Sequence, residues 1–218
     1  TAGAKGKFTV FANITGAASK ETLENARIAE EAGADVLVIA PLFYLDREDQ
    51  IEAHVDQLRR ETRLPIALYN NPGLHKGISV SSQVVGRLWT EGKISAIKDS
   101  SGDMDLLRAY VATGIPTYQG DEGNISAALQ AGARGTVGSA GSVWSPLQKM
   151  SDADDSTRER LQQQLLSFRD PLTAGLNKIP AGLKYVLSHT DVNGKPIMTT
   201  TLAPGSPSLS PSEEQGID

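Results

Sequence analysis

Cysteine is absent from the 218-residue sequence, and histidine occurs only at His54, His75 and His189, far apart along the chain. The absence of cysteine excludes disulfides and thiolate metal ligands within these residues, and the scattered histidines offer no metal-binding spacing. We therefore expect no metal and no cofactor and assign the histidines no role, with His54 on a solvated helix face. A chain without cysteine also fits the reducing cytoplasm.

Long hydrophobic runs and an excess of basic charge are missing as well. No segment approaches the roughly 20 consecutive apolar residues of a membrane-spanning helix, and the first residues lack the shape of a signal peptide. The net charge is −5, and no dense run of Lys and Arg is present to bind nucleic acid or an anionic membrane. We expect a cytoplasmic protein whose partner is a small molecule.

What the sequence does contain is a regular alternation of short apolar runs with helical patterns. This alternation is typical of repeated β-α units around a parallel sheet. The runs predicted to be strands are residues 8–12, 36–40, 65–69, 94–98, 116–119 and 135–139.

The helices between the runs are delimited by their end residues. The first is expected to begin at Ser19, a favourable N-cap, and to stop at Gly33, where a left-handed conformation meets no Cβ penalty. These patterns predict a domain of β/α units in residues 1–150, C-terminal helices in residues 151–200 and a tail rich in Pro and Ser in residues 201–218.

Six strands suit a doubly wound open sheet, whereas a closed β/α barrel needs eight. The open sheet commonly carries a glycine-rich G-x-G-x-x-G turn after its first strand, and no predicted strand here is followed by one. The turn after the fourth run, residues 99–102, holds a single glycine. The missing turn counts against the doubly wound sheet, and the number of strands counts against a closed barrel.

Polar residues at the strand ends are the candidates for chemistry, because the active site of a β/α barrel lies where strands pass into loops. Lys98 closes the fourth run and shares its parity with Ile94 and Ala96, which would point all three toward the barrel interior. A desolvated lysine favours the neutral amine, which can attack a carbonyl carbon, and the phenol of Tyr69 on the third run could relay protons. A solvated lysine and a core tyrosine are the structural alternatives.

Four segments together resemble one known family. They are residues 30–41, 68–72, 97–103 and 132–139. In order and spacing these segments resemble the dihydrodipicolinate synthase and N-acetylneuraminate lyase family, which includes the 2-keto-3-deoxy sugar acid aldolases. The resemblance implies a (β/α)8 TIM barrel, a homotetramer, and a lyase in which Lys98 holds pyruvate as a Schiff base while Tyr69 relays protons.

The same resemblance assigns a substrate channel to Gly120, Glu122 and Ser139, and gives Phe43 or Tyr44 the place of an aromatic residue beside the proton relay. For Glu122 the structural alternative is an acidic residue near a helix N-terminus.

The sequence departs from the family in two places. It holds no Gly-Ser/Thr-Thr-Gly-Glu turn, which binds the substrate carboxylate in the family. The match begins at the third strand of the family's barrel. We therefore expect that the first two β-α units are lacking and that residues 1–150 form a partial β/α barrel of strands three to eight. Leu74 stands where the synthases usually show an arginine for the second substrate's carboxylate. The main expectation is an aldolase for a sugar-derived 2-keto acid, and the alternatives are 4-hydroxy-tetrahydrodipicolinate synthase and a non-catalytic or truncated relative.

Overall fold

The computed structural model describes residues 6, 8–75, 77–142, 144–173, 179–189, 191–192, 195–196, 210 and 215. The chain divides into two compact units, Thr1–Val137 and Gly138–Asp218. Apart from residues 210 and 215, the predicted tail at 201–218 lies outside the described residues.

The first unit is built on a sheet of six parallel strands that follow one another in chain order. Its strands are β1 (Phe11–Asn13), β2 (Val36–Ile39), β3 (Ile66–Asn70), β4 (Ala96–Asp99), β5 (Thr117–Gln119) and β6 (Gly135–Thr136). The strand order never reverses, so the sheet lacks the switch point of a doubly wound fold. Each predicted run contains or overlaps one of these strands, and the curled sheet is that of part of a TIM barrel.

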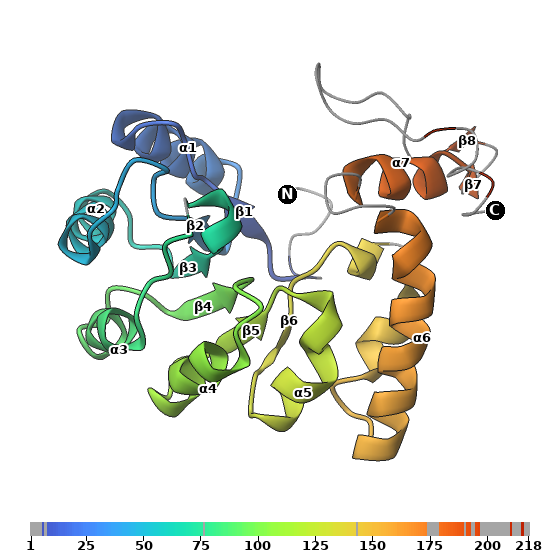
Figure 1. Ribbon diagram of the computed structural model, residues 1–218. Coiled ribbons are helices and arrows are strands. Elements are labelled where there is room, and N and C mark those ends of the chain that lie inside the picture. Colours follow the sequence, from blue (N-terminus) through green and yellow to red (C-terminus); the bar gives the residue numbers. More distant parts are fainter. Residues whose placement is uncertain are drawn as a thin grey trace. The chain divides into compact units, whose positions relative to one another are not determined.

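A helix joins each strand to the next, and Figure 1 shows α1 to α4 along one side of the sheet. The helices are α1 (Ser19–Glu31), α2 (Glu48–Glu61), α3 (Ser82–Thr90), α4 (Met104–Ala112) and α5 (Ile125–Gln130), with short 3-10 turns η1 (Pro72–Leu74) and η2 (Glu122–Asn124). Helix α1 ends as predicted, because Gly33 adopts φ +81° directly after its last turn. Its N-cap is Ala18, and Ser19 is the first helical residue.

The two faces of the sheet differ in burial. Side chains toward the helices, such as Leu37, Leu68 and Ile97, are completely buried and form the core with the apolar faces of α2 and α3. The alternate residues form the opposite side, which we call the inner face, and there Tyr69 and Lys98 stay half-buried. Polar chemistry is therefore possible on the inner face, while the outer face is committed to packing.

The expectation that His54 lies on a solvated face of its helix is wrong. His54 is 5% exposed and belongs to the buried side of α2 together with Ile51, Val55 and Leu58. Its Nδ1 lies 3.4 Å from Ser19 Oγ on α1, and burial lowers the pKa of the ring. His54 is thus a core residue between α1 and α2.

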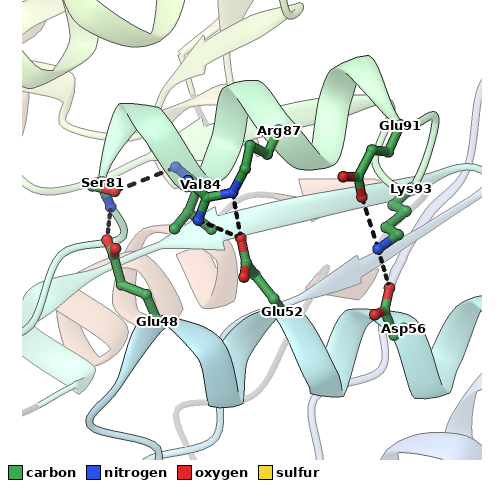
Figure 2. Close-up of polar contacts among 8 residues, drawn as sticks. All are labelled: Glu48, Glu52, Asp56, Ser81, Val84, Arg87, Glu91 and Lys93. Atoms are coloured by element: carbon green, nitrogen blue, oxygen red, sulfur yellow. Dashed lines mark hydrogen bonds and ion pairs between the residues drawn. The ribbon is translucent and has the colours of Figure 1, made fainter.

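Polar contacts fasten α2 to α3 (Figure 2). Ser81 caps α3 by accepting a hydrogen bond from Val84 N at 3.3 Å, while Glu48 of α2 accepts from Ser81 N at 2.9 Å. In a capping box the residue at the position of Val84 would accept that second bond, and here the neighbouring helix supplies the carboxylate instead. One turn along, Arg87 donates to Glu52 at 2.6 Å. These contacts fix the start of α3, the helix that follows the loop after β3.

The second unit contains the C-terminal helices. Its elements are the 3-10 turns η3 (Ala140–Ser142) and η4 (Ser145–Lys149), helices α6 (Asp155–Thr173) and α7 (Ile179–His189), and the antiparallel strands β7 (Asp191–Val192) and β8 (Lys195–Pro196). Leu161 and Leu165 bury the apolar side of α6. In the described part of the chain, none of the helices combines the length and the apolar character needed to cross a membrane.

Candidate active site

Lys98 and Tyr69 lie side by side on the inner face of the sheet. They are direct partners in the register of β3 and β4, and the Lys98 Nζ lies 4.2 Å from the centroid of the Tyr69 ring. On its other side Lys98 is the register partner of Tyr118 in β5. The strand that carries Lys98 is therefore flanked by two strands that each carry a tyrosine, and the amine lies over the ring of Tyr69.

A pocket of about 180 Å³ opens on the inner face around these residues. Its lining residues are Phe11, Asn13, Val38, Ala67, Tyr69, Lys98, Tyr118 and Val137. Lys98 is the one charged residue of that lining, and the surrounding wall is largely apolar or aromatic. A small pocket with few polar groups suits a small molecule rather than a polymer.

The amine of Lys98 has no carboxylate partner among the described residues. Lys93 provides the contrast, because its Nζ lies 2.6 Å from Asp56 and 2.8 Å from Glu91 (Figure 2). Hydrogen bonds to Asp56 and Glu91 raise the pKa of Lys93, so that lysine is held as the ammonium ion. Lys98 lacks such carboxylate partners among the described residues and contacts the ring of Tyr69 instead.

The loop after β4 is organised by carboxylate hydrogen bonds. Asp99 accepts bonds from Asn70 Nδ2 at 2.7 Å and from Ser101 Oγ at 2.9 Å. Burial raises the pKa of the Asp99 carboxyl, and the bonds from Asn70 and Ser101 oppose the shift. Asp103 then caps α4 by accepting from Leu106 N. Because Asn70 and Asp99 are register partners, their bond ties the ends of the two strands that carry Tyr69 and Lys98.

Gly120 lies against Lys98 at the end of β5. Its N–H donates to Asp99 O at 2.6 Å, and a Cβ added to it would lie 1.9 Å from Ser100 Oγ and 2.8 Å from Lys98 Cε. A side chain at this position would have to displace the lysine stem or the turn after β4. Glycine is thus required by the close approach of the two strand ends.

We expect Gly120→Ala to destabilise the protein by about 1–3 kcal/mol, the usual cost of overpacking a close contact. Urea unfolding measures the change as a shift in midpoint at constant slope. Gly135→Ala is the matched control, because a Cβ there meets the Tyr118 ring at 3.7 Å, which is ordinary contact. Equal midpoints for the two variants would show that the contact at Gly120 relaxes without cost.

Comparison with known proteins assigns the chain to a family. The sequence profile of the dihydrodipicolinate synthetase family matches residues 1–214. The chain belongs to this family. A relative from Bacillus velezensis, 4-hydroxy-tetrahydrodipicolinate synthase, is 30% identical over 196 residues, covering 86% of this chain and 68% of the relative. N-acetylneuraminate lyase from Salmonella agona is 29% identical over 215 residues, covering 92% and 70%.

Solved structures of the dihydrodipicolinate synthetase family share the fold. The dihydrodipicolinate synthase of Bacteroides thetaiotaomicron superimposes with a TM-score of 0.86 at 21% identity, covering 98% of this chain and 74% of that one. A prophage protein of the family from E. coli K12, in complex with pyruvate, gives 0.84 at 22% identity with the same coverage. The predicted family is confirmed, and with it membership in a family of enzymes, while the chain spans about two thirds to three quarters of these relatives.

The other residues that the family resemblance singled out lie in several places. Glu122 is buried at the start of η2, and Phe43 and Tyr44 are exposed and pack edge to face with ring centroids 5.1 Å apart. None of these three lines the pocket, and Ser139 belongs to the second unit. The structure therefore brings together Lys98, Tyr69 and Gly120.

Sequence reasoning missed several residues around Lys98. Tyr118 and Phe11 line the pocket and pack edge to face with centroids 6.4 Å apart. The parity of the fifth run would have found Tyr118, since it lies two residues before Gly120. Asn71 precedes Pro72 and Gly73, a combination typical of turns, yet its Nδ2 donates a hydrogen bond to the Tyr69 hydroxyl at 2.7 Å. Its place two residues after Tyr69 is the signal that could have revealed it.

Proposed function

We propose that the chain is a Schiff-base-forming aldolase or lyase that cleaves or condenses a 2-keto acid and holds pyruvate as the covalent fragment. The observation that carries the proposal is the Lys98 amine, without a carboxylate partner among the described residues, over the ring of Tyr69 in a small pocket. The pyruvate complex of the E. coli K12 prophage protein supports the choice of ligand.

The reaction follows from these two side chains. The neutral amine of Lys98 attacks the keto carbon, a proton taken from solvent lets the oxygen leave as water, and a protonated imine forms. This cation draws electrons from the neighbouring carbon. The bond from that carbon to the next one breaks once the next carbon's hydroxyl gives its proton to the phenol oxygen of Tyr69, which passes its own proton to solvent. An aldehyde departs and the enamine remains on Lys98. Return of a proton to the enamine and hydrolysis of the imine release pyruvate and the free lysine.

The family resemblance extends the proposal to the remaining predicted residues. Gly120, Glu122 and Ser139 would line the substrate channel, and Phe43 or Tyr44 would stand beside the proton relay. We also propose that β1 to β6 correspond to strands three to eight of the (β/α)8 barrel, supported by the coverage of about three quarters of the solved relatives. The homotetramer and the cytoplasmic location stay predictions.

The second candidate is 4-hydroxy-tetrahydrodipicolinate synthase, which is the name of the relative from Bacillus velezensis. Against it stands Leu74, at the position where the synthases usually show a carboxylate-binding arginine. Leu74 is 64% exposed in η1, and an alkyl side chain cannot form the charge-assisted bonds that hold a carboxylate. The proposal therefore favours a substrate derived from a sugar acid.

We expect the purified protein to cleave or dehydrate 2-keto-3-deoxy sugar acids or N-acetylneuraminate with a higher kcat/KM than it shows for condensing pyruvate with aspartate semialdehyde. Comparing kcat/KM for the two substrate sets decides between the candidates. Higher efficiency with aspartate semialdehyde would identify the synthase instead.

Two variants sharpen this comparison. Leu74→Arg should raise kcat/KM for aspartate semialdehyde by roughly 10- to 100-fold, the worth of a new bond to a charged group. Lys98→Arg should abolish turnover of both substrate sets and so reveals any contaminating activity. Absence of turnover with every substrate would favour the third reading, a non-catalytic relative.

A further inference from the structure

We infer that Asn71 is a positioning residue for the Tyr69 hydroxyl, an inference that rests on the proposed function. Its Nδ2 donates to the phenol oxygen at 2.7 Å. Among the described residues this is the hydrogen bond that the hydroxyl makes. The orientation of the proton relay thus depends on one amide.

The backbone explains how this amide reaches the phenol. Asn71 precedes Pro72, and a residue before proline is restricted to extended conformations. Its φ is −144° and its ψ is 89°, so the chain continues almost straight past the end of β3. In extended chain, residues two apart point to the same side, which places the side chains of Tyr69 and Asn71 together.

The Asn71 side chain binds the Tyr69 hydroxyl and makes no hydrogen bond within the local turn. Asn71 is the N-cap of η1, where an asparagine side chain ordinarily accepts a backbone N–H. Here it makes no cap hydrogen bond. Gly73 leaves room for this arrangement, because a Cβ there would approach Asn71 Oδ1 to 3.2 Å.

An amide donor on the phenol oxygen has two consequences. It fixes the direction of the hydroxyl, so the phenolic proton points away from Asn71 and is free for transfer. It also stabilises the oxygen when that proton has been given up, since a hydrogen bond to a charged acceptor is stronger than one to a neutral acceptor. The hydrogen bond of Asn71 goes to Tyr69 and not to Lys98, so its loss should affect proton transfer without affecting formation of the imine.

Exchange of the methyl protons of pyruvate in D2O measures this step without any second substrate. Pyruvate and Lys98 form the imine with loss of water, Tyr69 removes a methyl proton, a deuteron returns, and hydrolysis releases the labelled acid. Loss of the methyl proton signal by NMR gives the exchange rate, and borohydride trapping measures imine formation separately. The variants are Asn71→Leu and Asn71→Asp, each alone and combined with Tyr69→Phe. Asn25→Leu is the control for the loss of one asparagine hydrogen bond away from Tyr69, since the Asn25 side chain donates a hydrogen bond to Ile14 O.

Asn71→Leu should lower the maximal exchange rate by roughly 10- to 100-fold, with half-saturating pyruvate and borohydride trapping unchanged. Asn71→Asp should be at least as slow, because a carboxylate cannot donate to the phenol. In the Tyr69→Phe background both substitutions should have almost no further effect, since the coupled group is gone.

Each contrary result has a distinct meaning. An equal loss from Asn71→Leu in the Tyr69 and Phe backgrounds, or no loss in either, overturns the positioning role while leaving the proposed relay intact. Full exchange by Asn71→Asp shows that the amide accepted rather than donated, and overturns the assignment of the donor. If Tyr69→Phe alone exchanges at the normal rate, the relay in the proposed function is wrong and the role of Asn71 falls with it.

Discussion

Borohydride added to the protein in the presence of pyruvate is expected to modify Lys98 irreversibly and no other residue. Reduction traps an imine, and an imine forms only where a neutral amine meets a ketone. Lys98 has no carboxylate partner among the described residues, whereas Asp56 and Glu91 keep Lys93 protonated. Intact mass measures the added fragment, and peptide mapping identifies the lysine that carries it.

Two substitutions complete this test. Lys98→Ala should lose both trapping and turnover because the nucleophile is gone. Lys98→Arg should fail equally, since the guanidinium stays protonated and cannot attack the keto carbon. Borohydride without pyruvate is the control for direct reduction. An adduct mapped to another lysine, such as Lys93 or Lys184, would overturn both the assignment of Lys98 and this reading of the pocket.

The sequence predicted the inner-face pair because strand parity is a strict geometric rule. Side chains alternate along a strand, so the position of Lys98 at the end of one run and of Tyr69 at the end of the preceding run placed both on one face. Neighbouring parallel strands then brought them into register as partners. The prediction needed only that two short apolar runs be adjacent strands.

Contacts that depend on packing between elements escaped the sequence. In the sequence His54 is one of several polar residues on α2. Its burial follows from the packing of α1 against α2, which the sequence does not show. The requirement for glycine at position 120 arises from Lys98 and Ser100 on the neighbouring strand end. Likewise, the carboxylate that accepts the hydrogen bond from the backbone N–H of Ser81, the N-cap of α3, is Glu48 of another helix. Each of these facts is set by distances between segments that a linear pattern does not contain.

The role of Asn71 was hidden for a different reason. Asparagine before proline is a turn signal on its own, and the 3-10 turn η1 does follow it. The same extended backbone also directs the amide to Tyr69. One residue thus serves the turn through its backbone and the phenol through its side chain, and a propensity argument finds only the first.

Tyr69→Phe is expected to remain fully trappable by borohydride with pyruvate but to turn over roughly 10² to 10⁴ times more slowly, the usual worth of a positioned acid-base group. The ring that contacts Lys98 Nζ at 4.2 Å is retained, so the amine keeps its surroundings while the proton carrier is removed. Imine formation and proton transfer are thereby separated in one variant. Single-turnover trapping and steady-state kcat on the same preparation measure the two steps.

The flanking tyrosine on β5 provides the matched comparison. Tyr118 is the register partner of Lys98 on the other side and lines the same pocket, but the contact to the amine and the bond from Asn71 belong to Tyr69. Tyr118→Phe should therefore cost less than about tenfold in kcat, below the range of a general acid-base group. A larger loss of kcat from Tyr118→Phe than from Tyr69→Phe would identify Tyr118 on β5 as the proton relay. Both tyrosines are register partners of Lys98, and only the phenol that carries the proton can limit turnover.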